Sequence, residues 1–143
     1  MIKIYLSIFI KTIIFFLLTV ITLNSQNASE ILIYADNISY DDNENLIAKG
    51  KAKIIHENEI IISDHIIYDK KNELIILPTE FSFKDNKNNY YYGTQGSFSK
   101  NLKKANIINV KMILNDGSRI VGNEAKRDGD IDIISKGVYS PCT

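Results

Sequence analysis

The alternation of apolar and polar residues with a period of two is the feature that most restricts how this chain can fold. It is clearest from residue 46 to residue 54, where one side carries Leu46, Ala48, Gly50, Ala52 and Ile54 and the other carries Lys49, Lys51 and Lys53. Successive side chains of a β-strand point to opposite faces. The pattern therefore predicts a strand with one buried face and one face toward water.

Similar short runs continue along the rest of the chain. They cover residues 59–63, 65–69, 73–83, 106–114, 118–122 and 130–135. Clusters of turn-forming residues separate them, at 41–45, 69–72, 84–89, 115–117 and 127–130. No segment after residue 28 shows a sustained period of 3.6 residues. The sequence therefore predicts an all-β domain.

A weak internal repeat underlies these runs. Residues 35–50 align with residues 63–78 at an offset of 28, which pairs Asp36 with Asp64, Tyr40 with Tyr68, Asp41 with Asp69 and Leu46 with Leu74. Residues 122–137 align with the first copy at an offset of 87, and residues 96–109 form a weaker copy. Each copy reads as two strands around a polar turn, so we expect four units that stack and cover one another.

The N-terminus has the layout of a secretory signal peptide, with Lys3 and Lys11 followed by an apolar run over residues 12–23. As a helix, this run would span about 18 Å, which is short for a hydrocarbon core of about 30 Å. We expect the signal to be cleaved, with Ser25 or Ala28 as the last residue removed. An uncleaved anchor, with Lys11 buried or snorkelling, is the alternative.

Cleavage would leave residues 29–143 as a single domain. Lys3 and Lys11 are removed with the signal, so this domain keeps 15 of the 17 basic residues and all 17 acidic ones. Such a balanced charge argues against a nucleic-acid-binding protein, which normally shows a basic excess. Export would place the domain where disulfides persist, yet its one cysteine, Cys142, cannot close an internal bridge.

Three stretches resemble a known family. They read "YADNISYDDNENLIAKGKAKI", "ISDHIIYDKKNELI" and "LNDGSRIVGNEAKRDGDIDIISKGVYSPC". Together they resemble the OstA-like family of periplasmic domains over about residues 30–142. The A-D-x-x-x-Y-D unit fits LptA-type and LptC-type members as well. "DGSRIVGNEAKR" followed by "VYSPC" is similar to the N-terminal domain of the LptD type, the LPS-assembly proteins.

The resemblance implies a β-jellyroll after an N-terminal signal helix, in the form of a V-shaped, open stack of two sheets. It implies lipopolysaccharide transport through the periplasm and assembly into the outer membrane of a Gram-negative bacterium, without a cofactor. The partners that it implies are lipopolysaccharide, another OstA-like protein of the LptA type, and an outer-membrane barrel. A bridging carrier of the LptA type is the alternative within the family.

Physical chemistry also favours an apolar groove for such a cargo, because each exposed methylene of an acyl chain costs about 0.8 kcal/mol. We expect the groove to be lined by the apolar faces of the alternating runs. These faces carry Leu46, Ala48, Ala52, Ile54, Ile61, Ile75, Leu77, Phe81, Phe83, Ile108, Val110, Met112 and Leu114. An ordinary dry core fits each of these positions equally well, because periodicity identifies a buried face but not what fills it.

The run at residues 30–35 contains no lysine or proline that would protect a sheet edge. We interpret Ile31, Leu32, Ile33 and Tyr34 as an edge strand to which a partner adds its own strand. Internal pairing of this strand is the alternative.

Cys142 also has two interpretations. In LptD relatives the cysteine of the "YSPC" segment takes part in disulfides to the barrel, so the resemblance implies that Cys142 forms an intermolecular disulfide. The alternative is a free thiol without a role.

Catalytic motifs are weak in this sequence. His56 and His65 are the only histidines, and consecutive residues of "SDH" at 63–65 point to opposite faces of a strand, so they cannot form a triad. The acidic stretches "DDNEN" and "DGDID" lack the glycine and terminal glutamate of a calcium loop. We therefore expect neither an enzyme nor a metal site.

Three classes of function remain open. The first is a lipopolysaccharide conduit, and the second is a purely structural β-stack with a closed core. The third is a carbohydrate-binding module that would use the aromatic run "YYYG" at 90–93.

Overall fold

The computed structural model describes residues 30–141, which form one antiparallel sheet of twelve strands. The first six strands are β1 (Ile31–Tyr34), β2 (Asn37–Tyr40), β3 (Leu46–His56), β4 (Glu59–Asp69), β5 (Leu74–Leu77) and β6 (Phe81–Lys84). The other six are β7 (Tyr90–Gly93), β8 (Gln95–Ser99), β9 (Lys104–Ile113), β10 (Arg119–Asp128), β11 (Ile131–Ser135) and β12 (Val138–Ser140). The predicted signal segment and Cys142 lie outside the described residues.

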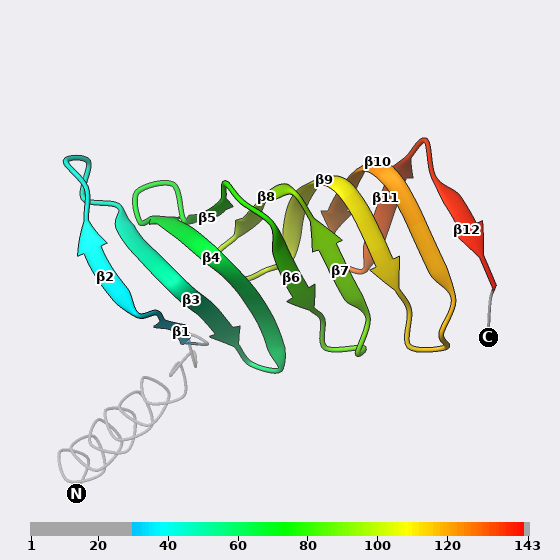
Figure 1. Ribbon diagram of the computed structural model, residues 1–143, viewed down its shortest axis with the longest axis horizontal. Helices are drawn as coiled ribbons and strands as arrows, with labels where there is room; N and C mark the ends of the chain where they lie inside the picture. The colour runs from blue at the N-terminus through cyan, green and yellow to red at the C-terminus, as the bar shows by residue number, and fades with distance from the viewer. Residues whose placement is uncertain (1–29, 142–143) are drawn as a thin grey trace, which may run out of the picture.

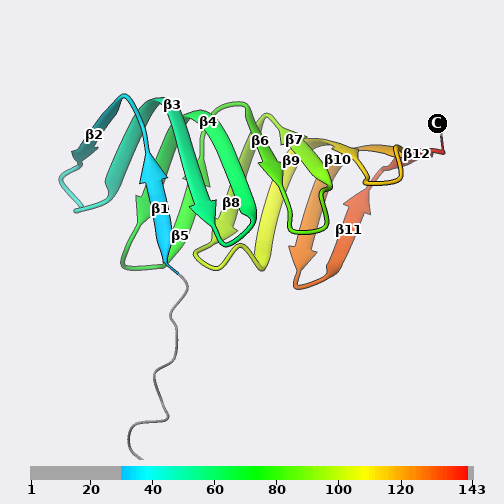
Figure 2. The same ribbon diagram turned by 90° about the horizontal axis from the view of Figure 1, so that it is seen from below.

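The sheet folds over into two layers because the long strands β3, β4, β9 and β10 each take part in both. In β3, residues 53–56 pair with β1, whereas residues 46–49 pair with β2. Layer A contains β1, β6, β7 and β12 together with one half of each long strand. Layer B contains β2, β5, β8 and β11 together with the other halves. Figures 1 and 2 show the strands in a row from β1 and β2 to β11 and β12.

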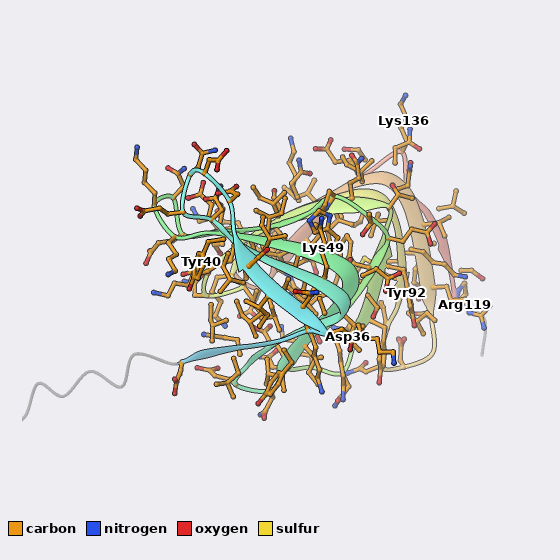
Figure 3. All side chains as sticks on the ribbon, turned by 60° about the vertical axis from the view of Figure 1, so that its left-hand side comes forward. Asp36, Tyr40, Lys49, Tyr92, Arg119 and Lys136 are labelled. Atoms are coloured by element: carbon orange, nitrogen blue, oxygen red, sulfur yellow. The ribbon has the colours of Figure 1, made fainter. Side chains whose placement is uncertain are left out.

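The long strands bend where they pass from one layer to the other. In β3, Gly50 and Lys51 have φ angles of 77° and 47°, and the register with β4 shifts between Lys49 and Ala52. In β9 the bend is at Asn109, with a φ of 51°. Asp36 makes the corresponding bend between β1 and β2, and Figure 3 shows it at one end of β2 with Tyr40 at the other. We call this side of the molecule the spine and the opposite side, where the hairpin turns lie, the rim.

The predicted repeat corresponds to the hairpins of layer B. Its four copies cover β2–β3, β4–β5, β8–β9 and β10–β11, and these hairpins follow one another in chain order along the layer. In two of their turns an aspartate accepts hydrogen bonds from the backbone and side chain of a nearby asparagine. Asp41 binds Asn45 in this way, and Asp69 binds Asn72.

Several of the predicted runs differ from the observed strands, and the run 118–122 is only the first part of β10. The run 73–83 is broken at Pro78, because the chain leaves layer B after β5 and enters layer A with β6. Conversely, the runs 59–63 and 65–69 are one strand, β4, in which Asp64 lies opposite the bend of β3. These differences arise at the spine, where the chain passes from one layer to the other.

Candidate functional site between the two layers

The space between the layers contains most of the residues that the sequence assigns to a groove. Ten of them are at most 5% exposed, namely Ala48, Ala52, Ile54, Ile61, Ile75, Leu77, Phe81, Phe83, Val110 and Met112. Leu46 and Leu114 are partly buried and pack against this core. The alternation therefore identified the inward face correctly at these twelve positions.

The prediction is wrong for Ile108, which does not belong to the core, whereas its neighbour Ile107 is 2% exposed. The register of β9 with β10 is unchanged across Asn109, but its left-handed backbone conformation (φ 51°) turns the strand, so the alternation of buried residues shifts there from Ile107 to Val110. Ile108 instead lines a shallow depression with Ile76 and Gln95.

Aromatic rings fill the middle of the interior. Phe98 of layer B lies between Phe81 and Phe83 of layer A, with ring centroids 5.7 Å and 5.0 Å away. Tyr91 packs against Phe83 at 5.3 Å. In this conformation the two layers are therefore in side-chain contact at their centre.

The interior is open at the β1 end. A pocket of about 540 Å³ lies there, with an apolar floor of Ile31, Ile33, Leu46 and Tyr68 and with Lys70 and Lys100 at its polar border. We call this pocket the mouth. Because it lies beside the packed core, it is the part of the interior that an apolar ligand would meet first.

The predicted edge strand β1 forms one wall of the mouth. Ile31 and Ile33 point inward and line it, whereas Leu32 and Tyr34 are 42% and 53% exposed. Within residues 30–141, β1 pairs with β3 alone. One edge of β1 is thus paired internally, and no described strand lies along the other.

A buried ionic cluster at the rim was not anticipated from the sequence. Its centre is Arg127 of β10, whose side chain is 10% exposed. The guanidinium lies 3.0 Å from Asp85 of the β6–β7 turn, 3.0 Å from Asp132 of β11 and 3.9 Å from Glu59 of β4. It also donates a hydrogen bond to the hydroxyl of Tyr91.

Aromatic contacts complete this cluster. The guanidinium carbon lies 4.6 Å from the ring centroid of Tyr91 and 5.1 Å from that of Phe83. The Tyr91 hydroxyl donates to Asp132 at 2.8 Å. Arg127 and Asp132 belong to layer B and the other members to layer A, so the cluster connects the two layers.

Burial and hydrogen bonding determine the protonation of the cluster. Burial raises the pKa of Glu59, against the opposing charges of Lys103 and Arg127. Burial also acts to raise the pKa of Asp85, but hydrogen bonds from Asn89 and Arg127 outweigh it and hold this pKa below its usual range. Burial acts to lower the pKa of Arg127, but its bond to Asp132 and the nearby Tyr91 and carboxylates raise it. Arg127 and Asp85 are therefore an ion pair at neutral pH.

The repeat contains a signal for Arg127. At the offset of 87, Arg127 takes the position of Tyr40 in the first copy, and Tyr68 takes the same position in the second. Tyr68 lines the mouth. Tyr40 is 60% exposed, so the repeat gives only a partial hint that a side chain at this position can face inward and that an arginine there needs partners.

The chemistry of the described residues offers little else. Residues 30–141 contain no group of three or more histidine, cysteine or acidic side chains that could hold a metal ion. Nor does this part of the chain contain a helix with the length and apolarity needed to cross a membrane. In the aromatic run at 90–93, Tyr90 and Tyr92 are 39% and 40% exposed, whereas Tyr91 is buried between the layers.

Comparisons with known proteins concern the fold. No protein-family model matches the chain, and no curated protein matches it in sequence. The structure is similar to that of LptH, the LptA-homologous periplasmic component of the lipopolysaccharide transport device from Pseudomonas aeruginosa, with a TM-score of 0.64. The two share 16% sequence identity, and the match covers 77% of this chain and 85% of that chain. The chain has the LptA-like jellyroll fold. This similarity confirms the fold class predicted from the sequence.

Proposed function

We propose that the chain is a periplasmic carrier of lipopolysaccharide, of the LptA type, that shelters acyl chains between its two layers. The observation that carries the proposal is the mouth, an apolar pocket of about 540 Å³ in an LptA-like jellyroll. The predicted signal segment and the absence of a recognisable catalytic motif in the sequence support it further. The assignment to the LptD type, with a disulfide from Cys142 to a barrel, stays a prediction and depends on residues outside the described range.

The proposal assigns different parts to the interior residues. An acyl chain first contacts Ile31, Ile33 and Leu46 at the mouth. It then extends along the inward faces of the long strands, where the predicted groove residues lie. Because those residues are in contact with one another in this conformation, the chain must displace aromatic side chains such as Phe83 and Phe98 to advance.

Photocrosslinking to lipopolysaccharide tests the proposal. A photoreactive phenylalanine analogue replaces Ile33 in the mouth, Phe83 in the core or Tyr92 on the outer face. We expect crosslinks from the first two positions and none above background from Tyr92, which is 40% exposed but points away from the interior. Equal labelling at the three positions, or labelling at none, would contradict the proposal.

A further inference from the structure

The rim differs markedly between its two halves. Toward β1 the layers are separated by the open mouth. Toward β11 the turns of the two layers surround a small polar pocket of about 110 Å³, and side-chain contacts connect them there. The interior is therefore open at the β1 half of the rim and closed by side-chain contacts at the β11 half.

The contacts in the closed half connect layer A with layer B. Arg127 reaches Asp85 at 3.0 Å, and Tyr91 reaches Asp132 at 2.8 Å. At the surface, Lys87 of the β6–β7 turn forms an ion pair of 3.0 Å with Asp130 of the β10–β11 turn. We call these three contacts the rim clamp.

Leu102 lies beneath the rim clamp and is fully buried, although it belongs to the β8–β9 turn. Its φ of 55° is unfavourable for leucine, a backbone conformation that costs about 1–2 kcal/mol. Hydrogen bonds hold this turn against its neighbours, including one from Lys100 N to Glu73 O and one from Gly129 N to Lys103 O. The turn thus inserts one apolar side chain where the two layers meet.

The two sides of the interior are held in different ways. At the spine each long strand continues through a bend, so the layers are joined there by the backbone. At the closed half of the rim they are joined by side-chain contacts that can break without loss of a strand. Separation of the layers would therefore occur at the rim and turn about the spine.

We propose that the rim clamp is a latch that controls how far an aliphatic chain can pass from the mouth into the interior. With the latch closed, Leu102 and the ring contact between Phe83 and Phe98 block the path. When Arg127, Tyr91 and Lys87 release their partners, the layers separate at the rim and the chain advances between the rings. This inference rests on the proposed carrier function and adds to it the step that regulates binding.

A crosslink across the rim tests the latch. The variant Lys87→Cys/Asp130→Cys, in a Cys142→Ser background, is joined by a short bis-maleimide and holds the two layers together. Its matched control is Lys104→Cys/Asp128→Cys, in the same background with the same reagent. Lys104 and Asp128 also form an exposed ion pair, 3.9 Å long, but they face one another within layer B.

The first readout is uptake of N-phenyl-1-naphthylamine, an uncharged apolar dye that becomes fluorescent in an apolar environment. We expect the rim crosslink to slow uptake by at least about tenfold, whereas the control crosslink leaves it unchanged. Loss of one clamp contact should have the opposite effect. We expect Lys87→Ala to speed dye uptake by about two- to fivefold, the size of effect typical of one exposed ion pair. Lys104→Ala, which removes an ion pair within layer B, should leave the uptake rate unchanged. Two results would overturn the latch. One is dye uptake at the wild-type rate in the rim-crosslinked protein, and the other is no dye uptake by any of the proteins.

The second readout separates the latch from the carrier function. The photocrosslinking to lipopolysaccharide described above is repeated with the probe at Phe83 in both crosslinked proteins. Loss of labelling with the rim crosslink alone supports the latch and the carrier together. If the latch controls the dye but lipopolysaccharide labels no variant, the latch stands as a gate for another apolar ligand and the carrier proposal fails. If lipopolysaccharide labels both crosslinked proteins equally, the carrier stands and the latch is wrong.

Discussion

Arg127 shows how a single residue can link two layers between which no backbone hydrogen bond forms at the rim within residues 30–141. Its guanidinium is planar and carries several donors, so it can bind Asp85 and Asp132 at the same time and still pack on the rings of Phe83 and Tyr91. A lysine could provide the charge but not this geometry. Position 127 therefore requires both the positive charge and the planar shape of an arginine side chain.

Removal of this side chain should destabilise the protein strongly. We expect Arg127→Met to lower the free energy of unfolding by about 3–5 kcal/mol, because the buried carboxylates lose their counter-charge. Arg127→Lys should lower it by less. The neighbouring Lys126, exposed on the other face, is the control, and Lys126→Met should change it by less than about 0.5 kcal/mol. Urea denaturation measures all three, and equal stability of Arg127→Met and wild type would contradict the prediction.

The two buried carboxylates should give opposite dependences of stability on pH. The pKa of Asp85 is lower in the folded state, so its contribution is present above its ordinary pKa of 3.8 and is lost as the pH falls through the folded value. The pKa of Glu59 is raised above 4.5, so the folded state binds more protons and stability is lost as the pH rises from 4.5 through the folded value.

Glu59→Gln should remove the loss of stability with rising pH that Glu59 causes and should leave the loss at low pH that Asp85 causes. The test is the urea denaturation midpoint measured between about pH 3 and pH 7. Above pH 4.5 this midpoint should fall less with rising pH in Glu59→Gln than in the wild type. Glu80→Gln, at an exposed glutamate, should follow the wild-type curve. If the midpoint of Glu59→Gln fell with rising pH as steeply as that of the wild type, Glu59 would not be the source of this pH dependence.

At the scale of elements, the bends at the spine determine which strand halves belong to which layer. Gly50 is a clear example, because its φ is 77° and a Cβ there would lie 2.8 Å from Asp36 Oδ2. The backbone N–H of Asp36 donates to Gly50 O at 2.8 Å. The bend of β3 and the bend between β1 and β2 are therefore packed directly against each other.

Two glycine substitutions separate backbone strain from this close contact. Gly117→Ala places a Cβ in open space at a φ of 86°, so it should cost about 1–2 kcal/mol from the left-handed conformation alone. Gly50→Ala has the same strain and also a clash, so we expect a further loss of about 1–3 kcal/mol. Thermal or urea unfolding of the two variants gives the difference, and equal losses would show that Asp36 moves aside freely.

Much of the architecture is readable from the sequence, because the inward face of a strand leaves a local pattern. Leu77, Phe83 and Val110 could be placed inside from alternation alone. The bend at Asn109 could not, because asparagine in the left-handed conformation has no unique sequence signal, and Ile108 was misplaced as a result. The predicted edge, the signal segment and the role of Cys142 stay predictions.

The ionic cluster at the rim was harder to predict for a different reason. Asp85 and Arg127 are 42 positions apart in the chain and meet because the β6–β7 turn of layer A faces the end of β10 in layer B. No local pattern specifies such a contact. The repeat gave the available hint, through the arginine that stands at a tyrosine position.

At the scale of the whole molecule, both ends of the row carry strands with one described partner each. Leu32 and Tyr34 are exposed at one end, and Val138 and Tyr139 are 65% and 59% exposed at the other. Unpaired strand edges with apolar side chains favour addition of a further strand. We expect copies of the protein to associate end to end at high concentration.

A lysine at the β1 edge should weaken this association. We expect Leu32→Lys to raise the dissociation constant by about tenfold, because edge lysines oppose strand addition. Ile62→Lys is the matched control, since Ile62 is 48% exposed but lies in β4, away from either end. Sedimentation velocity over a concentration series distinguishes the two, and an equal effect of both variants would point to a general effect of charge.

The sharing of β3, β4, β9 and β10 by both layers also determines how the domain falls apart. A cut in any of these strands removes pairing from both layers at once, so neither layer can survive as a folded fragment. Limited proteolysis should accordingly yield either the uncut domain or short peptides, without a stable half-sized product. In the cell, a single cut in one of these strands would therefore expose the whole domain to proteases, and no folded fragment would accumulate.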